Sequence, residues 1–272
     1  MKPQNTICSV LACCATVAVV QTARCQIAYN GSALSYNQSF DSLGTNSVAW
    51  TDNGTLQGWY LNSTTLGVPA TVATSFGNNS GGGAFNVGVE GVHTVTDRAL
   101  GWLNASTIGT AYIGVQLQNT SGLDYVGDVS LTFTYEQWSA RNTVSDPLEV
   151  DYKANLVSTG NQLTSPGWTV LGSIASPNLS NTGGGTTHYI DGNTPGNFTT
   201  VTETVTFTSA NPWTAGTFLW FRTKDSDIAN NDDLNAIDDV MINVAHPVPE
   251  PSCWALLATG LAGWALARRR TH

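Results

Sequence analysis

The residues whose types and spacing could do chemistry gather in one acidic segment, residues 225–239. The segment holds six aspartates with asparagines among them: Asp225, Asp227, Asp232, Asp233, Asp238 and Asp239. Carboxylate and amide oxygens are hard ligands that suit Ca²⁺, which binds about six to eight oxygens. We therefore predict a Ca²⁺ site with Asp225, Asp227, Asp238 and Asp239 as its ligands. Because the segment joins two strands that we expect to be neighbours, both of its ends can converge on one ion.

The acidic segment can also be explained without an ion. Asp225-x-Asp227 begins like a calcium loop, but Ala229 stands where a third ligand is needed and no glutamate occupies the twelfth position. The segment is therefore not an EF-hand. The alternative is a polar turn in which Asp238 or Asp239 accepts backbone N–H groups or pairs with Arg222.

Charged residues are rare near the apolar runs, and they allow two interpretations. The residues in question are Arg98, Glu136, Arg141 and Arg222. The favoured interpretation is an ion pair between Glu136 and an arginine inside the fold. The alternative is glycosidase chemistry, which needs two carboxylates roughly 5 to 10 Å apart. Glu136 with Glu149 or Asp151 is the candidate pair.

Other enzyme signatures are missing from the sequence. Before the Val248-Pro249-Glu250-Pro251 stretch the chain has three histidines, His93, His188 and His246, and no H-E-x-x-H motif. It also lacks G-x-S-x-G, a P-loop and G-x-G-x-x-G. We expect no catalytic residues and no enzymatic activity.

Tryptophans are numerous in the body, and exposed ones could stack on sugar rings. They include Trp59, Trp102, Trp138, Trp168, Trp213 and Trp220. Most stand at positions that the strand pattern predicts to be buried, so we interpret them chiefly as core residues. Sugar binding remains the alternative.

These side chains must be positioned by strands, because short Thr-, Val- and aromatic-rich runs alternate with Gly/Asn/Ser clusters throughout the body. The clearest run is 127–138, where Val129, Leu131, Phe133 and Tyr135 alternate with polar residues. About a dozen such runs, Leu148 to Leu156 among them, and no amphipathic helix, predict one all-β domain over residues 26–245. We expect a jelly-roll-like antiparallel β-sandwich.

The two ends of the chain have a different character from the body. Residues 1–25 show Lys2, an apolar stretch and a polar step, the order of a secretory signal peptide that the Sec machinery exports. A lipoprotein reading of Cys25 is disfavoured, because Arg24 stands where a small residue is expected. Residues 246–272 carry Val248-Pro249-Glu250-Pro251, then an uncharged apolar run over 253–267, then Arg268, Arg269 and Arg270. As a helix, that run is about 22 Å long, short of the ~30 Å hydrocarbon core, so we expect a marginal transmembrane anchor.

This tail resembles a PEP-CTERM sorting signal, on Pro249-Glu250-Pro251, the apolar span and the arginine cluster. The resemblance implies a Gram-negative bacterial protein whose tail is processed by an exosortase in the inner membrane. It implies a transient inner-membrane anchor, followed by location at the cell surface or outside the cell.

The body resembles a β-sandwich domain that recurs in exported bacterial proteins of this kind. The likeness lies in short islands spread over residues 40–244, such as 97–101, 135–138 and 231–240. Relatives tend to read W-x-R-W-x-D in the penultimate strand. Here the strand reads Trp220-Phe221-Arg222-Thr223-Lys224-Asp225, so the second tryptophan is replaced. The resemblance implies no secure activity for the domain.

Charge and cysteine content restrict the partners and the sources of stability. Between the two end segments lie 18 acidic residues and 5 basic ones, a net charge of about −13. This excludes nucleic acid as a partner, because binding phosphates needs a basic face. All five cysteines lie in the end segments or at their border: Cys8, Cys13, Cys14, Cys25 and Cys253. The body therefore has no internal disulfide.

The sequence thus favours an exported, non-enzymatic protein of the cell surface or extracellular matrix, sorted through its tail. The alternative is a binding module for extracellular polysaccharide, with calcium as its cofactor. A hydrolase is the least favoured hypothesis.

Overall fold

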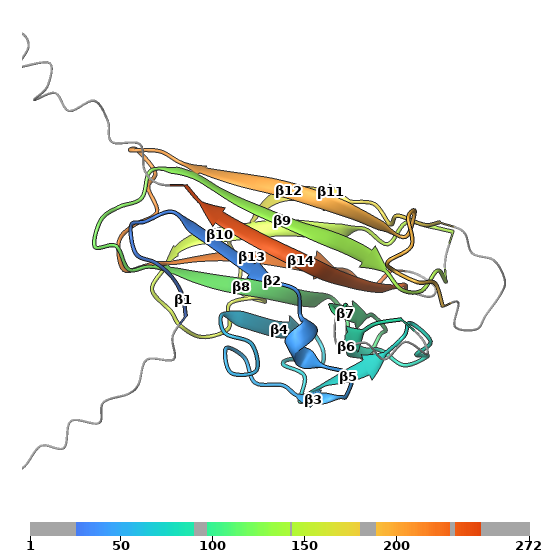
Figure 1. The fold of residues 1–272 in the computed structure, drawn as a ribbon. Helices are drawn as coiled ribbons and strands as arrows, with labels where there is room; N and C mark the ends of the chain where they lie inside the picture. The colour runs from blue at the N-terminus through green and yellow to red at the C-terminus, as the bar shows by residue number, and fades with distance from the viewer. Residues whose placement is uncertain (1–25, 90–96, 142, 180–188, 229–231, 246–272) are drawn as a thin grey trace, which may run out of the picture.

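Two stacked β-sheets make up the protein in a computed structural model that describes residues 26–89, 97–141, 143–179, 189–228 and 232–245 (Figure 1). The six-stranded sheet contains β1 (Ile27–Tyr29), β4 (Trp59–Ser63), β8 (Ala111–Asn119), β10 (Leu148–Leu156), β11 (Thr169–Ile174) and β13 (Phe218–Asp225). The eight-stranded sheet contains β2 (Leu34–Gln38), β3 (Val48–Ala49), β5 (Thr71–Ser75), β6 (Gly83–Val87), β7 (Ala99–Leu103), β9 (Gly127–Gln137), β12 (Phe198–Phe207) and β14 (Leu234–Val244). One short 3₁₀ turn, Asp41–Leu43, is the single helical element among the described residues. The predicted all-β sandwich is therefore confirmed.

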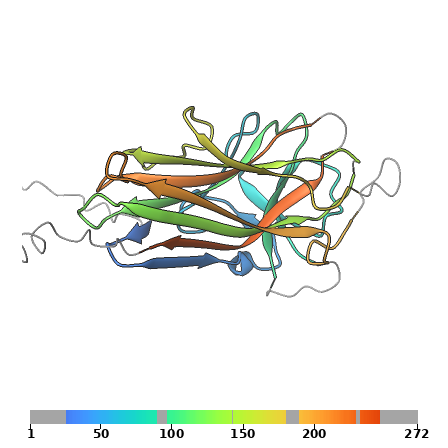
Figure 2. The same ribbon diagram turned by 90° about the horizontal axis from the view of Figure 1, so that it is seen from above.

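Both sheets are mostly antiparallel. In the six-stranded sheet the order is β1-β8-β13-β10-β11, with β4 also paired to β8. In the eight-stranded sheet the order is β12-β9-β14-β7-β6-β5-β3, with β2 also paired to β14. The parallel pairs are β1 with β8 and β5 with β6. The view in Figure 2 shows the long strands of the two layers running over one another.

The sequence patterns placed most strands within two or three residues of their observed bounds. The predicted strand Leu148 to Leu156 matches β10 fully, and the clearest predicted run matches β9. β1 and β5 were not predicted. β1 has only three residues, and Thr71–Ser75 is interrupted by Thr and Ser on both faces, so neither has a strong alternating pattern.

One expectation about the acidic segment is wrong. β13 and β14, the strands that the segment joins, are not neighbours: β13 pairs with β8 and β10, whereas β14 pairs with β9, β7 and β2. The chain therefore crosses from one sheet to the other between Asp225 and Leu234. Of the acidic residues in this segment, only those near the crossing can meet across the two sheets.

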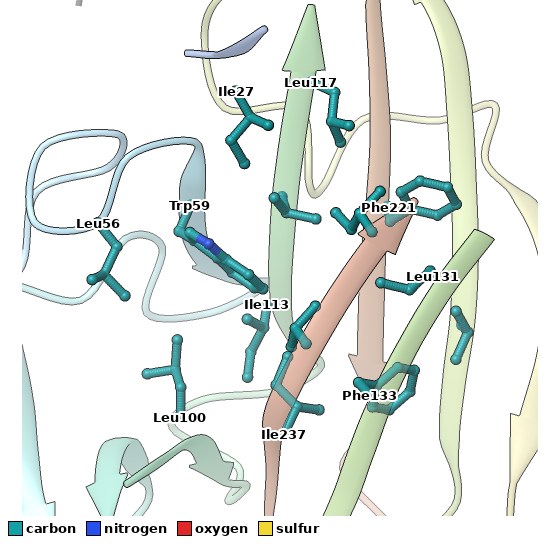
Figure 3. Packing of buried hydrophobic residues seen from close by; sticks show 14 of the residues in the cluster. Ile27, Leu56, Trp59, Leu100, Ile113, Leu117, Leu131, Phe133, Phe221 and Ile237 are labelled. Carbon is teal, nitrogen blue, oxygen red and sulfur yellow. The ribbon is translucent and has the colours of Figure 1, made fainter. Parts of the chain in front are cut away.

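The main core lies between the sheets, where the inward residues of each strand interdigitate (Figure 3). Trp59, Phe221 and Phe133 are each 1 % exposed, and Ile237 is 4 % exposed. Full burial of such a side chain contributes about 1.5 to 3 kcal/mol. Since the body contains no cysteine, this core is its principal source of stability.

β14 carries a bulge at Asp238 and Asp239 that organises the eight-stranded sheet. The register with β9 shifts between Asp238 and Met241, and Asp239 has a φ of 48°. Before the bulge β14 pairs with β7, and after it β14 pairs with β2. The extra residue bends the strand, so β14 has different neighbours along its two halves.

The predicted end segments, residues 1–25 and 246–272, lie outside the described residues and remain predictions. Among the described residues, no helix has the length and apolar character that a membrane crossing requires.

Candidate functional site

The four aspartates that the sequence suggested as calcium ligands lie in two separate places. Asp225 ends β13 and faces the space between the sheets, and Asp227 is exposed in the loop that follows. Asp238 and Asp239 lie at the bulge of β14. The acidic neighbours of Asp225 are Asp146 and Asp232, whereas those of Asp238 are Glu136, Asp239 and Asp97. Two distinct acidic clusters result.

The first, which we call the inner acidic cluster, lies between the sheets at one end of the core. It consists of Asp146, Asp225, Asp232, Asp233 and Asn235, all at most 4 % exposed. Leu148 pairs with Asp225 across β10 and β13, which places Asp146, two residues before Leu148, beside Asp225. Asn235 comes from the start of β14 in the other sheet. The cluster therefore joins the two layers.

Asn235 links two carboxyl groups of the inner acidic cluster. Its amide Nδ2 donates to Asp146 Oδ2 at 3.1 Å and to Asp225 Oδ2 at 3.3 Å. Its Oδ1 accepts from the Tyr135 hydroxyl at 2.9 Å. The Oδ1 atoms of Asp146 and Asp225 have no hydrogen-bond partner among the described residues.

Asp233 is held differently, because both of its carboxylate oxygens accept hydrogen bonds. Oδ1 accepts from the Arg141 backbone N–H at 2.6 Å, and Oδ2 accepts from Gln137 Nε2 at 2.8 Å. Its own N–H donates to Asp146 at 3.2 Å. Asp233 thus fixes the chain at the crossing.

Burial dominates the electrostatics of the inner acidic cluster. It raises the pKa of Asp146 to about 7, and the charge of Asp232 adds to the effect. Burial, followed by the charge of Asp146, raises the pKa of Asp225 well above its usual value. Burial also raises the pKa of Asp233 to about 7 and that of Asp232 to about 6. Hydrogen bonds and charges of the protein therefore do not offset the cost of burying these carboxyls in their ionised form.

The second, which we call the outer acidic cluster, lies on the face of the eight-stranded sheet that points away from the core. It consists of Asp97, Glu136, Asp191, Asp238 and Asp239. Glu136 accepts a hydrogen bond from Trp138 Nε1 at 2.9 Å. Burial, followed by the charge of Glu136, raises the pKa of Asp238 to about 9. Burial, with nearby acidic charges, raises the pKa of Glu136 to about 8.

The predicted pairing of Glu136 with an arginine is wrong. The two salt bridges among the described residues are Arg222–Asp151 at 2.6 Å and Lys224–Glu149 at 2.9 Å. Arg222 is thus engaged on the other sheet, and it does not pair with Asp238 or Asp239. Both bridges lie on the outward face of the six-stranded sheet, since Phe221, the residue before Arg222, points into the core and successive strand residues point to opposite faces.

The candidate glycosidase pair is separated by the sandwich. Glu136 lies on the outward face of the eight-stranded sheet, and Glu149 and Asp151 lie on the outward face of the six-stranded sheet. The core lies between them. Neither carboxyl can therefore act with Glu136 on one glycosidic bond.

The tryptophans considered for sugar stacking are mostly inaccessible. Trp59, Trp102, Trp138, Trp213 and Trp220 are each at most 1 % exposed. Trp168 is half-buried on the outward face of the six-stranded sheet, where the Arg222 guanidinium carbon lies 4.2 Å from its ring centre. Trp168 is therefore the one member of this set that a ligand could reach.

A metal site built from acidic side chains alone does not fit this geometry. Among the described residues, no three or more His, Cys, Asp or Glu side chains are grouped so that they could hold one metal ion. A cation here would need neutral oxygens from amides, backbone carbonyls or water as well.

Sequence reasoning missed Asp146. It lies in Ser145-Asp146-Pro147, which is typical of a turn, and it is far in the chain from the acidic segment. Only the pairing of β10 with β13 brings it to Asp225. The sequence pattern does not specify this pairing.

The function of the tail is indicated by a comparison with protein families. Residues 247–270 match the PEP-CTERM protein-sorting motif. The predicted resemblance of the tail to a PEP-CTERM sorting signal is therefore confirmed. The predicted sorting residues, from Val248 to Arg270, fall within this match, and their individual roles stay predictions. The PEP-CTERM motif implies export and a C-terminal, membrane-associated sorting signal. The match covers the tail and assigns no family to the sandwich.

Comparisons of the whole chain are less informative. No curated protein matches the sequence. Among solved structures, a cyclase from Fischerella sp. TAU is 18 % identical with a TM-score of 0.45, covering 78 % of this chain and 97 % of that one. The CBM22-1–CBM22-2 tandem domain of Paenibacillus barcinonensis Xyn10C is 10 % identical with a TM-score of 0.41, covering 77 % of this chain and 50 % of that one. The cleaved adhesin domain K3 of Lys-gingipain from Porphyromonas gingivalis is 14 % identical with a TM-score of 0.37, covering 78 % and 98 %. Likeness at this level does not indicate a function.

Proposed function

We propose that this protein is an exported β-sandwich that an exosortase processes at its PEP-CTERM tail, and that it then acts at the cell surface or in the extracellular matrix without catalysis. The observation that carries the proposal is the motif match at residues 247–270. The export machinery and the exosortase are the partners it requires, and the inner membrane holds the chain only for a time.

The arrangement of the sandwich supports removal of the tail. β14 is the last strand among the described residues and ends at Val244, three residues before the match begins. Every described strand is therefore complete before the motif. Cleavage near Pro249-Glu250-Pro251 leaves all strand pairings intact, so the released body keeps its fold.

The placement of the carboxyl groups supports a role without catalysis. Acid–base catalysis needs its carboxyls within reach of a substrate. Asp146 and Asp225 are buried between the sheets, and Glu136 and Asp238 are at most 5 % exposed. We propose that these groups serve the fold.

Polysaccharide binding is the second candidate function, and Trp168 favours it. Its half-buried ring lies beside Arg222, and Lys153 Nζ donates to Ser165 and Pro166 in the loop that leads to it. A partly exposed aromatic ring near the cationic side chain of Lys153 suits a sugar, or a sugar acid. A glycan-array signal that Trp168→Ala abolishes and that Val157→Ala, at an 86 % exposed position, leaves unchanged would support this candidate.

The sorting proposal is tested with the full-length chain in a host that has an exosortase. Pro249→Ala combined with Glu250→Ala and Pro251→Ala should leave the chain unprocessed in the membrane fraction, seen on immunoblots as a larger species. Pro247→Ala is the matched control, because it changes a neighbouring proline outside the triplet. Equal processing of the triple variant and the parent chain would refute the proposal.

A further inference from the structure

The inner acidic cluster contains two carboxyl groups that meet without a base between them. Asp146 is 0 % exposed and Asp225 is 3 % exposed, and both accept from the same Asn235 amide nitrogen. No salt bridge among the described residues involves either carboxyl. Two buried carboxylates held this close repel one another in a medium of low dielectric constant. The pair needs a positive partner or protons.

The unpartnered oxygens show where such a partner would bind. Oδ1 of Asp146 and Oδ1 of Asp225 accept from no donor group among the described residues, although both are buried, and the two carboxyls lie within hydrogen-bond reach of one another. An unsatisfied polar atom inside a protein is costly, and more so when it is charged. A cavity of about 10 Å³, the space of about one water molecule, is lined by Asp225 and Asn235. Its other walls are mostly apolar, among them Trp102 and Ile237.

We propose that Asp146, Asp225 and the side chain of Asn235 form a Ca²⁺ site between the two sheets. Two carboxylates neutralise the charge of the ion, and the amide supplies a third oxygen. Backbone carbonyl oxygens or water complete the six to eight ligands that Ca²⁺ takes. This ligand set retains Asp225 from the sequence prediction, adds Asp146, and leaves out Asp227, Asp238 and Asp239.

Asn235 must turn its amide for this role, and its surroundings permit the turn. Without an ion, Nδ2 faces the carboxyls and Oδ1 accepts from Tyr135. The Tyr135 hydroxyl also lies 3.2 Å from the Asp146 carbonyl oxygen. When the amide turns, the hydroxyl donates to that carbonyl and accepts from Nδ2, so neither group loses its partner. Asn and Gln amides can be turned in this way because their two ends have nearly the same shape.

A bound ion would strengthen the link between elements that are otherwise joined by packing and by hydrogen bonds such as those of Asn235. Asp146 precedes β10 and Asp225 ends β13 in the six-stranded sheet, and Asn235 begins β14 in the eight-stranded sheet. The body has no cysteine that could make such a link. A ligand that binds only the folded protein raises its stability by mass action. The inference does not depend on the sorting function, and either can fail without the other.

The test measures the melting temperature of the full-length protein in mild detergent, with excess Ca²⁺, with excess Mg²⁺ and with chelator. We expect Ca²⁺ to raise it by about 5 °C or more over the chelated protein. Mg²⁺ should act weakly, because it is smaller and demands near-octahedral geometry. If acid stabilises the protein and Ca²⁺ does not, protons alone neutralise the two carboxyls and the proposal is overturned. Equal stabilisation by Ca²⁺ and Mg²⁺ would also overturn it.

Variants locate the site. Asp225→Asn and Asp146→Asn should each abolish the Ca²⁺ shift, and both amides keep the shape of the acid. Asp238→Asn, at an equally buried carboxyl of the outer acidic cluster, should keep the shift. Loss of the shift in Asp238→Asn alone would place the ion elsewhere and refute the assignment. If near-ultraviolet circular dichroism shows that neither inner variant folds, Tb³⁺ binding to the parent protein is the deciding measurement. Its luminescence, excited through Trp102 and Tyr135, should appear and be displaced by Ca²⁺, and its absence contradicts the site.

Discussion

The outward faces of the two sheets deal with buried charge in different ways. On the six-stranded sheet, Asp151 meets the Arg222 guanidinium at 2.6 Å, and side-chain exposures of 1 % and 9 % show that water is excluded. On the eight-stranded sheet, Glu136 and Asp238 are nearly as buried, but the groups around them are acidic as well. One face compensates a carboxylate with a base, and the other favours its protonated form.

This difference follows from where the few basic residues lie. Of the five basic residues in the body, Lys153, Arg222 and Lys224 all lie on the outward face of the six-stranded sheet. The acidic excess of the body is therefore concentrated on the eight-stranded sheet and at the crossing between the sheets. The net negative charge of the body is thus unevenly distributed in the fold.

The largest expected effect is from breaking the buried ion pair. Asp151→Asn leaves the Arg222 charge without its carboxylate, at a position where Tyr112 and Trp168 exclude water. Removing one partner of a buried pair costs about 3 to 5 kcal/mol. We expect a loss of this size in the free energy of unfolding, measured with urea at neutral pH.

The matched control is the double variant Asp151→Leu with Arg222→Met. It removes both charges together, and such replacements are often neutral or stabilising. It should lose much less stability than Asp151→Asn. If the single variant loses under about 1 kcal/mol, water reaches the pair and the contrast between the two faces is smaller than the exposures indicate.

The second effect is the pH dependence that arises on the eight-stranded sheet. The pKa of Glu136 is raised to about 8 and that of Asp238 to about 9, both chiefly by burial, with Asp97, Asp191 and Asp239 adding negative charge. The folded state therefore binds protons more tightly than the unfolded chain. Stability from these groups is fully present below about pH 4, the ordinary carboxyl range, and is lost as pH rises toward 9.

We expect the melting temperature of the chelated protein to fall by several degrees between pH 6 and pH 9. Asp238→Asn should reduce this fall, because its amide cannot ionise and Glu136 then faces one acid fewer. The remaining fall comes from the inner acidic cluster, where burial raises the pKa of Asp146 and of Asp233 to about 7. Asp124→Asn, at an exposed aspartate that belongs to neither acidic cluster, is the control and should not change the slope. A flat profile in the parent chain would mean that these carboxyls are ionised without penalty.

The extent to which the sequence predicted this structure depends on the range of the interaction. Alternation of apolar and polar residues is local, so β9 and β10 could be placed closely from Val129 to Tyr135 and from Leu148 to Leu156. Strand pairing is not local. Nothing in the sequence around Asp225 shows that β13 and β14 belong to different sheets. The expectation that both ends of the acidic segment converge on one ion assumed that these two strands are neighbours.

The same limit applies to the site residues. Asp225 was identified because it lies in a dense run of aspartates, but Asp146 stands alone in a turn and carries no such signal. Glu136 was expected to find an arginine because a buried acid usually has a base. Its actual partner, Trp138 two residues along, is a neutral donor that sequence rules on charge pairing do not consider.

The smallest expected effect is from the second ion pair on the six-stranded sheet. Lys224 and Glu149 lie 2.9 Å apart, but each side chain is 29 % exposed. An accessible pair gains little, about 0 to 1 kcal/mol, because water and salt weaken its attraction. A double-mutant cycle with Lys224→Met and Glu149→Gln should give a coupling energy in this range that falls as salt is added. The bridge lies two residues from Arg222 on the same strand, so the two pairs differ chiefly in their access to water. A coupling as large as that of Arg222 with Asp151, and insensitive to salt, would show that the strand position and not burial sets the strength of an ion pair on this face.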